Sequence, residues 1–281
     1  MAVVLDGKEV ARKIRQNLKE EVSKLKEEGI SPKLAVIMVG DDSASKIYVR
    51  NKSIACNEIG IEYEEYLLNE ETTMDELLSL IDKLNNDKTI NGILLQSPIP
   101  KKLDINEAFK AIDPIKDVDG FNPMNVGKLC LGQDAFISCT PYGVIKILED
   151  YNIEIEGKNA VIIGRSNIVG KPMLQCLLNK NATVTVCHSR TKNLAEITKM
   201  ADILVVAIGK SKFVTKNMVK DGAVVVDVGI NRGEDGKLCG DVDFEEVSKV
   251  ASYITPVPGG VGPMTIAMLM NNIVKATKLQ N

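Results

Sequence analysis

The sequence has no stretch approaching the roughly 20 consecutive apolar residues that a membrane-spanning helix needs, so we expect no membrane partner. It also has no excess of basic residues. The net charge is −3, so we do not expect nucleic acid to be the main partner. The chain turns polar after its fifth residue and lacks the apolar core of a signal peptide. These absences predict a cytoplasmic protein.

Cysteine pairs and histidine clusters are absent as well. The six cysteines are scattered without a C-x-x-C pair, which favours buried free thiols over a disulfide framework or a metal site. His188 is the single histidine, and without a cluster of other ligands it predicts no bound metal. Its place at the end of an expected strand, away from hydride chemistry, makes a catalytic role the weaker of its two interpretations.

Apolar strands alternate with helical segments along all 281 residues, a length that suits two domains. Strands are expected at residues 34–40, 62–68 and 90–96, with helices between them. This repetition predicts a mostly parallel sheet covered by helices. Residues 97–127 carry four prolines and little apolar periodicity, so we expect a loop-rich transition there.

The alternation restarts in the second half of the chain, with strand ends at spacings of 24, 21 and 20 residues, namely at Gly164, His188, Gly209 and Gly229. That cadence is typical of a doubly wound dinucleotide domain. We therefore predict an α/β protein of two domains. Residues 1–118 form a three-layer-type α/β domain, and residues 119–281 form a Rossmann-like doubly wound domain. Its last helix, about 264–281, packs back toward the first domain.

The turn in AVIIGRSNIVGKP matches neither common phosphate-binding motif, although Gly164 and Gly170 would let a pyrophosphate approach a helix start. A plain strand-to-helix turn is the competing interpretation. An NAD site places an acid after the next strand, but CHSRT has none there and offers Ser189 and Arg190, with Arg165 nearby. Hydroxyl and guanidinium donors suit a 2′-phosphate. The turn therefore favours NADP over NAD.

The segment SKIYVRNK places Ser45, Tyr48 and Lys52 on one face of an expected helix. A solvated helix edge is the alternative. Two other polar stretches favour a binding site: LLQSPIP with Gln96, and KDVDGF with Asp117 and Asp119. A lysine in a partly dry cleft has a lowered pKa and can move protons.

These motifs, read together with DVGINR, GDVDF and ITPVPGGVGPMT, closely resemble the bifunctional methylenetetrahydrofolate dehydrogenase/methenyltetrahydrofolate cyclohydrolase family. The resemblance runs from about Asp6 to Lys278, with the motifs in the same order. One departure is Ser97, where the family usually has leucine, and it puts the packing beside Gln96 in question.

The resemblance implies a role for each motif. Lys52 would be the central catalytic residue, positioned by Gln96, with Tyr48 against the folate and Asp119 holding the pterin N–H donors. Ser45 would add a cofactor or substrate contact. The remaining implied contacts fall into two groups, the folate contacts Pro258 and Gly259 and the NADP contacts Arg165, Ser166, Ser189, Ile230 and Thr265, the last of which would start the final helix. The predicted cofactor residues also include Gly164 and Gly170 of the glycine turn, Arg190 of CHSRT, and Gly209 at a later strand end.

The implied reactions are the NADP-dependent oxidation of 5,10-methylene-tetrahydrofolate and the hydrolysis of its methenyl product to 10-formyl-tetrahydrofolate. The resemblance also implies a homodimer. Two alternatives stay open from the residues alone. One is another NADP enzyme, such as an amino-acid or shikimate-type dehydrogenase, and the other is a non-enzymatic NADP-binding regulatory module.

Overall fold

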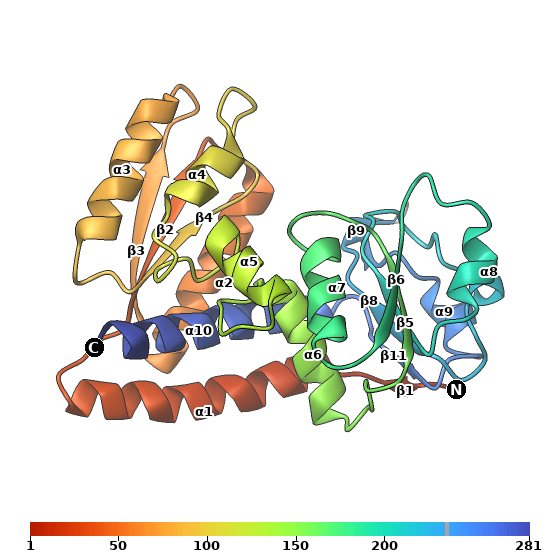
Figure 1. Cartoon of the computed structure of the whole chain (residues 1–281). Helices are drawn as coiled ribbons and strands as arrows, with labels where there is room; N and C mark the ends of the chain where they lie inside the picture. The colour runs from red at the N-terminus through yellow and green to blue at the C-terminus, as the bar shows by residue number, and fades with distance from the viewer. Residues whose placement is uncertain (234–235) are drawn as a thin grey trace. The chain divides into compact units, whose positions relative to one another are not determined.

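The computed structural model describes residues 1–233 and 236–281. Its contacts divide the chain into two compact units. The three-stranded unit consists of Lys13–Ile137 and Ile266–Asn281, and the six-stranded unit of Met1–Arg12 and Ser138–Thr265. Figure 1 shows helices α1 (Gly7–Glu27) and α10 (Val261–Gln280), each of which contributes residues to both units. The prediction of two α/β parts is confirmed.

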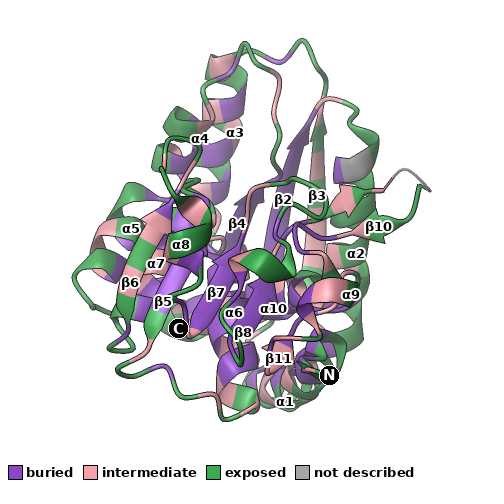
Figure 2. Cartoon of the chain, turned by 90° about the vertical axis from the view of Figure 1, so that its right-hand side faces the viewer, coloured by how far each residue is buried: buried purple, intermediate pink, exposed green. Residues whose placement is uncertain are grey.

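A parallel sheet in the order β3-β2-β4 forms the centre of the three-stranded unit. The central strand β2 (Lys33–Val39) is buried from its second residue onward, and β4 (Gly92–Leu95) is buried throughout (Figure 2). Continuous apolar runs of this kind are typical of strands covered on both faces. The edge strand β3 (Glu62–Leu68) is only partly buried. All three strands lie where the sequence predicted them.

Helices α2 (Ser43–Ile59) and α3 (Met74–Asn86) connect these strands, and both begin at side-chain caps. The carboxylate of Asp42 accepts a hydrogen bond from the backbone N–H of Ser45 at 2.7 Å. Thr73 and Glu76 form a reciprocal capping box at the start of α3. Such caps satisfy backbone donors that have no intrahelical partner, so they define where each helix begins.

The loop-rich transition predicted for residues 97–127 is wrong in part, because two short helices lie there: α4 (Ile105–Ala111) and α5 (Pro123–Cys130). Asp104 caps the first helix and Asn122 the second. Pro123 occupies the first turn of α5, where a missing N–H costs nothing. The prolines were therefore helix starts and connections rather than evidence against helices.

The second part of α10 belongs to the three-stranded unit, which confirms the predicted return of the last helix. The buried Asn272 side chain donates hydrogen bonds to the carbonyls of Val118 at 2.8 Å and Ile137 at 3.0 Å. This unit extends to Ile137. The division into a domain of residues 1–118 and a domain of residues 119–281 stays a prediction.

The six-stranded unit is a parallel sheet in the order β1-β11-β8-β7-β5-β6. Its strands are β1 (Val3–Val4), β5 (Asn159–Ile163), β6 (Thr183–Cys187), β7 (Ile203–Val206), β8 (Val224–Asp227) and β11 (Tyr253–Ile254). Its other elements are α6 (Cys139–Asp150), α7 (Gly170–Leu178), α8 (Leu194–Thr198), the 3₁₀ helix η1 (Lys216–Met218), α9 (Phe244–Val247), and a hairpin of β9 (Asn231–Arg232) and β10 (Leu238–Cys239).

Strand order in this sheet reverses at β5, because the chain passes from β5 to β6 on one side and then to β7 on the other. Ligands of doubly wound sheets bind outside the carboxyl ends of the strands at such a reversal. The strands β5, β6, β7 and β8 were predicted from the sequence. The two-residue strands β1 and β11 were not, because two residues carry no detectable periodicity.

Burial follows the strands of this sheet closely. The strands β7 and β8 are buried along their whole length and form the core with residues from the surrounding helices. Four of the six cysteines are buried, and Cys130 is exposed. Across residues 1–233 and 236–281, no helix is long and apolar enough to cross a membrane.

Candidate functional site

Lys52 and Gln96 meet in the three-stranded unit although 44 residues separate them. Lys52 lies on α2, and Gln96 follows the last residue of β4. The Lys52 Nζ donates to Gln96 Oε1 at 2.8 Å, and the Gln96 Nε2 donates to the carbonyl of Ser97 at 2.6 Å. Because Gln96 is buried and bonded at both ends of its amide, it holds the half-buried amine in one orientation.

Tyr48 and Ser45 share α2 with Lys52, as the sequence predicted. Tyr48 is exposed, so its ring is available to a ligand. Ser45 is buried, and among the described residues its hydroxyl has no hydrogen-bond partner. A buried hydroxyl without a partner is costly, which is consistent with an additional contact at this place on the helix.

The motif KDVDG separates into a structural part and a surface part. The buried Asp117 carboxylate accepts hydrogen bonds from the backbone N–H groups of Gly120 and Phe121 at 3.1 Å, from the Asn122 N–H at 2.8 Å and from the Asn125 side chain at 2.8 Å. Burial raises the pKa of Asp117 to about 6, against the opposing effect of these donors. Asp117 therefore shapes the turn.

The neighbouring Lys116 is also structural. Its buried amine donates to the carbonyls of Leu84, Asn85 and Asp87 at 2.7–2.9 Å, where α3 ends. Burial lowers the pKa of Lys116. Asp119 is half-buried on the same turn, which leaves it as the carboxylate of the motif that a ligand can reach.

Replacing Asp117 with asparagine is expected to reduce the free energy of unfolding by about 1–3 kcal/mol. The amide would turn an N–H toward backbone N–H groups that now donate to the carboxylate. Urea unfolding checks this expectation. Asp113→Asn, at an exposed position nearby, is the matched control and should change stability by less than about 0.5 kcal/mol. Equal losses in both variants would contradict the structural role of Asp117.

The glycine turn after β5 is closed by two close backbone approaches. Gly164 has φ +127°, and a Cβ there would lie 2.3 Å from the carbonyl oxygen of Ala207. A Cβ on Gly170 would lie 2.3 Å from the carbonyl oxygen of Gly164. Neither position accepts a side chain, so both glycines are required for the close packing of this turn ahead of α7.

Ser166 has a structural contact in this turn. Its Oγ accepts hydrogen bonds from the N–H groups of Val169 at 3.1 Å and Gly170 at 3.4 Å. The residue is exposed, so its hydroxyl proton can still reach a ligand. Its predicted cofactor contact stays a prediction.

Arg165, Ser189 and Arg190 are exposed and follow the adjacent parallel strands β5 and β6. The N–H of Gly164 donates to the carbonyl of Cys187 at 2.9 Å, which ties the two strand ends together. The structure thus brings together the ends that carry these three side chains. No carboxylate lies in CHSRT.

His188 has a structural role in the second of these loops. Its Nδ1 accepts a hydrogen bond from the N–H of Arg190 at 3.2 Å. The backbone groups of His188 also bond Thr191, at 2.9 Å through the threonine hydroxyl and at 2.8 Å through its N–H. These contacts hold the turn that presents Ser189 and Arg190.

The Pro-Gly segment at the end of the six-stranded unit forms a tight turn. Pro258 is exposed, and Gly259 has φ +111° while its carbonyl accepts from the N–H of Lys8 at 3.1 Å. We predicted that Thr265 would start the last helix, and this prediction is wrong. The helix begins at Val261, because Pro263 fits its first turn. The Thr265 hydroxyl lies 3.0 Å from that of Thr140.

The sequence did not single out two buried carboxylates, although they lie in the motifs DVGINR and GDVDF. Asp227 ends β8, and Asp241 lies between β10 and α9. Asp241 bonds the loops that carry the predicted contacts Gly209 and Ile230, both of which are exposed. No sequence motif indicated the roles of Asp227 and Asp241, because their hydrogen bonds join segments that are far apart in the chain.

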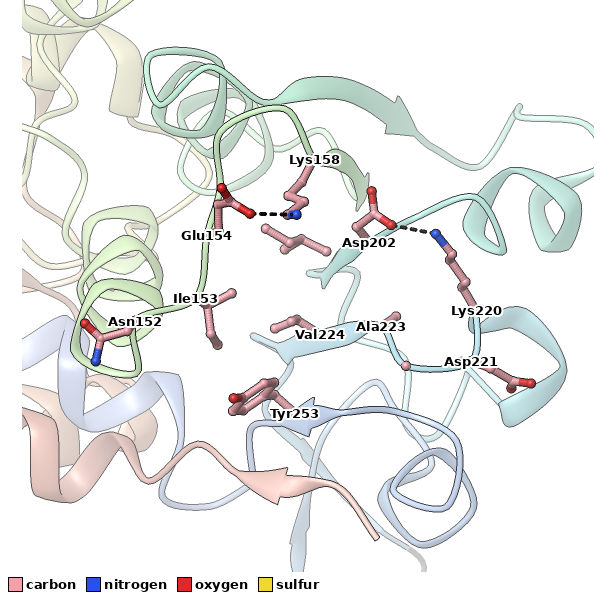
Figure 3. Close-up of a pocket in the computed structure, with 12 residues that line it drawn as sticks. Asn152, Ile153, Glu154, Lys158, Asp202, Lys220, Asp221, Ala223, Val224 and Tyr253 are labelled. Atoms are coloured by element: carbon pink, nitrogen blue, oxygen red, sulfur yellow. Dashed lines mark hydrogen bonds and ion pairs between the residues drawn. The ribbon is translucent and has the colours of Figure 1, made fainter.

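A separate pocket of about 380 Å³ lies at the opposite, amino-terminal ends of β7, β8 and β11. Figure 3 shows its two ion pairs, Glu154 with Lys158 at 2.8 Å and Asp202 with Lys220 at 2.6 Å. These pairs satisfy the charges with one another. The pocket contains none of the predicted site residues, and ligands of parallel sheets bind at the other edge.

Comparison with known proteins gives full-length matches. Residues 5–119 match the tetrahydrofolate dehydrogenase/cyclohydrolase catalytic domain, and residues 138–281 match the NAD(P)-binding domain of the same family. A "Bifunctional protein FolD" of Halalkalibacterium halodurans is 59% identical over 277 residues, which cover 99% of each chain.

Solved structures of similar proteins agree with these matches. The bifunctional methylenetetrahydrofolate dehydrogenase/cyclohydrolase FolD of Campylobacter jejuni is 54% identical, with 100% of both chains covered and a TM-score of 0.99. The Trypanosoma brucei enzyme, solved with NADP cofactor and an inhibitor, is 38% identical, with 99% of this chain and 98% of that chain covered and a TM-score of 0.94.

Proposed function

Because this chain belongs to the tetrahydrofolate dehydrogenase/cyclohydrolase family, we propose that it carries out both reactions of that family with NADP as cofactor. The first reaction oxidises 5,10-methylene-tetrahydrofolate to the methenyl cation. The second adds water to that cation and opens the ring to 10-formyl-tetrahydrofolate, with release of one proton. The hydrogen bond from Lys52 to Gln96 is the observation that carries the catalytic part of the proposal.

The residues of the six-stranded unit fit NADP. Gly164 and Gly170 lie where a Cβ would collide with backbone, so they allow the tight turn before α7, beside which the pyrophosphate would bind. Arg165, Ser189 and Arg190 would hold the 2′-phosphate by charge-assisted hydrogen bonds. When bound, NADP⁺ supplies the hydride acceptor.

Lys52 would move the protons of the hydrolytic step. Water that attacks the methenyl carbon must lose a proton, and the ring nitrogen that leaves must gain one before the ring opens. An amine held by Gln96 Oε1 can accept the first proton and deliver the second when it is neutral at the start of the step. A neutral amine also avoids repulsion of the cationic substrate.

The folate would be held by side chains that the structure leaves reachable. Tyr48 would lie against its ring system, and Asp119 would accept hydrogen bonds from the pterin N–H donors. Pro258 and Gly259 would add contacts from the Pro-Gly turn. Thr265 and Ile230 would contact the nicotinamide part of NADP.

The purified protein is expected to form NADPH from methylene-tetrahydrofolate and NADP⁺, and to hydrolyse methenyl-tetrahydrofolate without added nucleotide. Both reactions can be followed by absorbance. A shikimate-type or amino-acid dehydrogenase would produce NADPH only from a hydroxy or amino acid. A regulatory module would bind NADP without turnover in either assay.

The family resemblance also supports a homodimer located in the cytoplasm. We propose this assembly and location together with the activity.

A further inference from the structure

One buried carboxylate joins two loops of the six-stranded unit. The Asp241 Oδ2 accepts hydrogen bonds from the N–H groups of Ile208 at 2.7 Å and Gly209 at 3.0 Å. Its Oδ1 accepts from the N–H of Lys210 at 2.7 Å and from the Asn231 side chain at 2.8 Å. Both oxygens are thus occupied by donors from two different loops.

These loops follow the carboxyl ends of adjacent strands. Residues 208–210 come after β7, and residues 230–231 come after β8, which pairs with β7 in parallel. The first loop begins beside the glycine turn, since the N–H of Ala207 donates to the carbonyl of Ile163 at 2.8 Å. The Gly164 Cβ position also faces the Ala207 carbonyl. Asp241 therefore bonds a loop that begins beside the turn proposed to bind the cofactor.

Only an acceptor-only side chain can make this set of contacts. Asp241 is 0% exposed, and its recorded partners in the described part of the chain are N–H groups rather than a lysine or arginine. A carboxylate provides two oxygens with several lone pairs, whereas an amide replaces one oxygen with two further donors. The loops therefore depend on the carboxylate itself.

Asp227 holds Asp241 in place from the other side. The Asp227 carboxylate accepts from the backbone N–H groups of Asp241 at 3.0 Å, Val242 at 2.8 Å and Gly229 at 2.9 Å. Burial raises the pKa of Asp227 to about 6, with a smaller contribution from the neighbouring Asp241 charge.

Two glycines leave room for this pair of acids. A Cβ on Gly240 would lie 1.8 Å from Asp227 Oδ2, and one on Gly229 would lie 2.2 Å from Asp241 Cγ. The motifs GDVDF and DVGINR thus pair each acid with a glycine that admits the other.

We propose that Asp241 is a positioning residue for NADP, whose carboxylate holds residues 208–210 and 230–231 in the conformation that receives the cofactor. This inference rests on the proposed function of the chain. Asp241 contacts the loops and not the cofactor, so its removal weakens NADP binding without changing the proton chemistry of Lys52.

The test measures NADP⁺ dissociation constants, and KM and kcat for both reactions, in Asp241→Asn. The Kd and KM for NADP⁺ are expected to rise about tenfold or more, because the loss of hydrogen bonds to a charged group is large. The kcat/KM for hydrolysis of methenyl-tetrahydrofolate is expected to stay within about twofold of wild type. Asp243→Asn is the matched control, since asparagine also caps helices and α9 keeps its start.

The double variant Asp241→Asn/Asn231→Asp restores one carboxylate–amide pair across the two loops. It is expected to recover part of the lost NADP⁺ affinity, which a merely destabilised fold would not do. If Asp241→Asn does not fold, Asn231→Ala decides instead. It releases the 230–231 loop from the carboxylate, whose Oδ1 keeps the Lys210 N–H, and should raise the KM for NADP⁺ severalfold in a protein that still folds.

Unchanged NADP⁺ affinity in folded Asp241→Asn, or in Asn231→Ala when the first variant does not fold, would overturn the positioning role. Equal losses in both activities would overturn it too, because they indicate a general defect. Failure of the wild-type protein to form NADPH would instead refute the proposed function, so the two failures are distinguishable.

Discussion

Lys52→Met is expected to lower the turnover of methenyl-tetrahydrofolate hydrolysis by about 10²–10⁴-fold, the usual contribution of a positioned acid–base group. Methionine keeps the length of the side chain but has no proton to move and cannot donate to Gln96 Oε1, which now accepts from Lys52 at 2.8 Å. The decrease in methenyl absorbance measures the effect directly.

Lys46→Met is the matched control for this variant. Lys46 lies on the same helix and is exposed, with its ion pair to Asp41 at the surface. The Lys46→Met variant should hydrolyse methenyl-tetrahydrofolate at the wild-type rate. Dehydrogenase turnover in Lys52→Met should fall less than hydrolysis, because hydride transfer depends mainly on positioning. Near-normal hydrolysis by Lys52→Met would remove Lys52 from the catalytic role.

Arg165→Ala/Arg190→Ala is expected to reduce kcat/KM for NADP⁺ by about 10²–10³-fold, because each hydrogen bond between charged groups contributes roughly 1.5–3 kcal/mol. The value for NAD⁺ should change little, since NAD⁺ has no 2′-phosphate. Steady-state kinetics with both nucleotides measure the preference. Lys199→Ala removes an exposed positive charge beyond this loop and serves as the control. Equal losses with NADP⁺ and NAD⁺ would contradict selection through the 2′-phosphate.

Long helices and strands could be predicted from the sequence because the pattern of their apolar residues indicates which positions are buried. The strand β2, for example, lies within one residue of its predicted bounds. Two-residue strands could not be found in this way, since β1 and β11 depend on pairing between distant segments. The helices α4 and α5 were missed because prolines were weighed without their capping neighbours.

The site shows the same division. The i, i+4 spacing of Tyr48 and Lys52 predicted their common helix, and the structure adds the bond from Lys52 to Gln96. The different roles of Asp117 and Asp119 were not predictable, because they depend on which of the two carboxylates the turn encloses. The role of Asp241 likewise depends on hydrogen bonds to residues about 30 positions away.

The glycine turn after β5 divides two tasks between backbone and side chains. The tight turn depends on Gly164 and Gly170, where any Cβ would collide with backbone, so a side chain at either position is expected to destabilise the fold. The residues proposed to choose the nucleotide, Arg165, Ser189 and Arg190, are exposed. Exposed substitutions usually change stability by no more than about 0.5 kcal/mol. Nucleotide preference is therefore an evolvable trait, open to drift and redesign at almost no cost to folding.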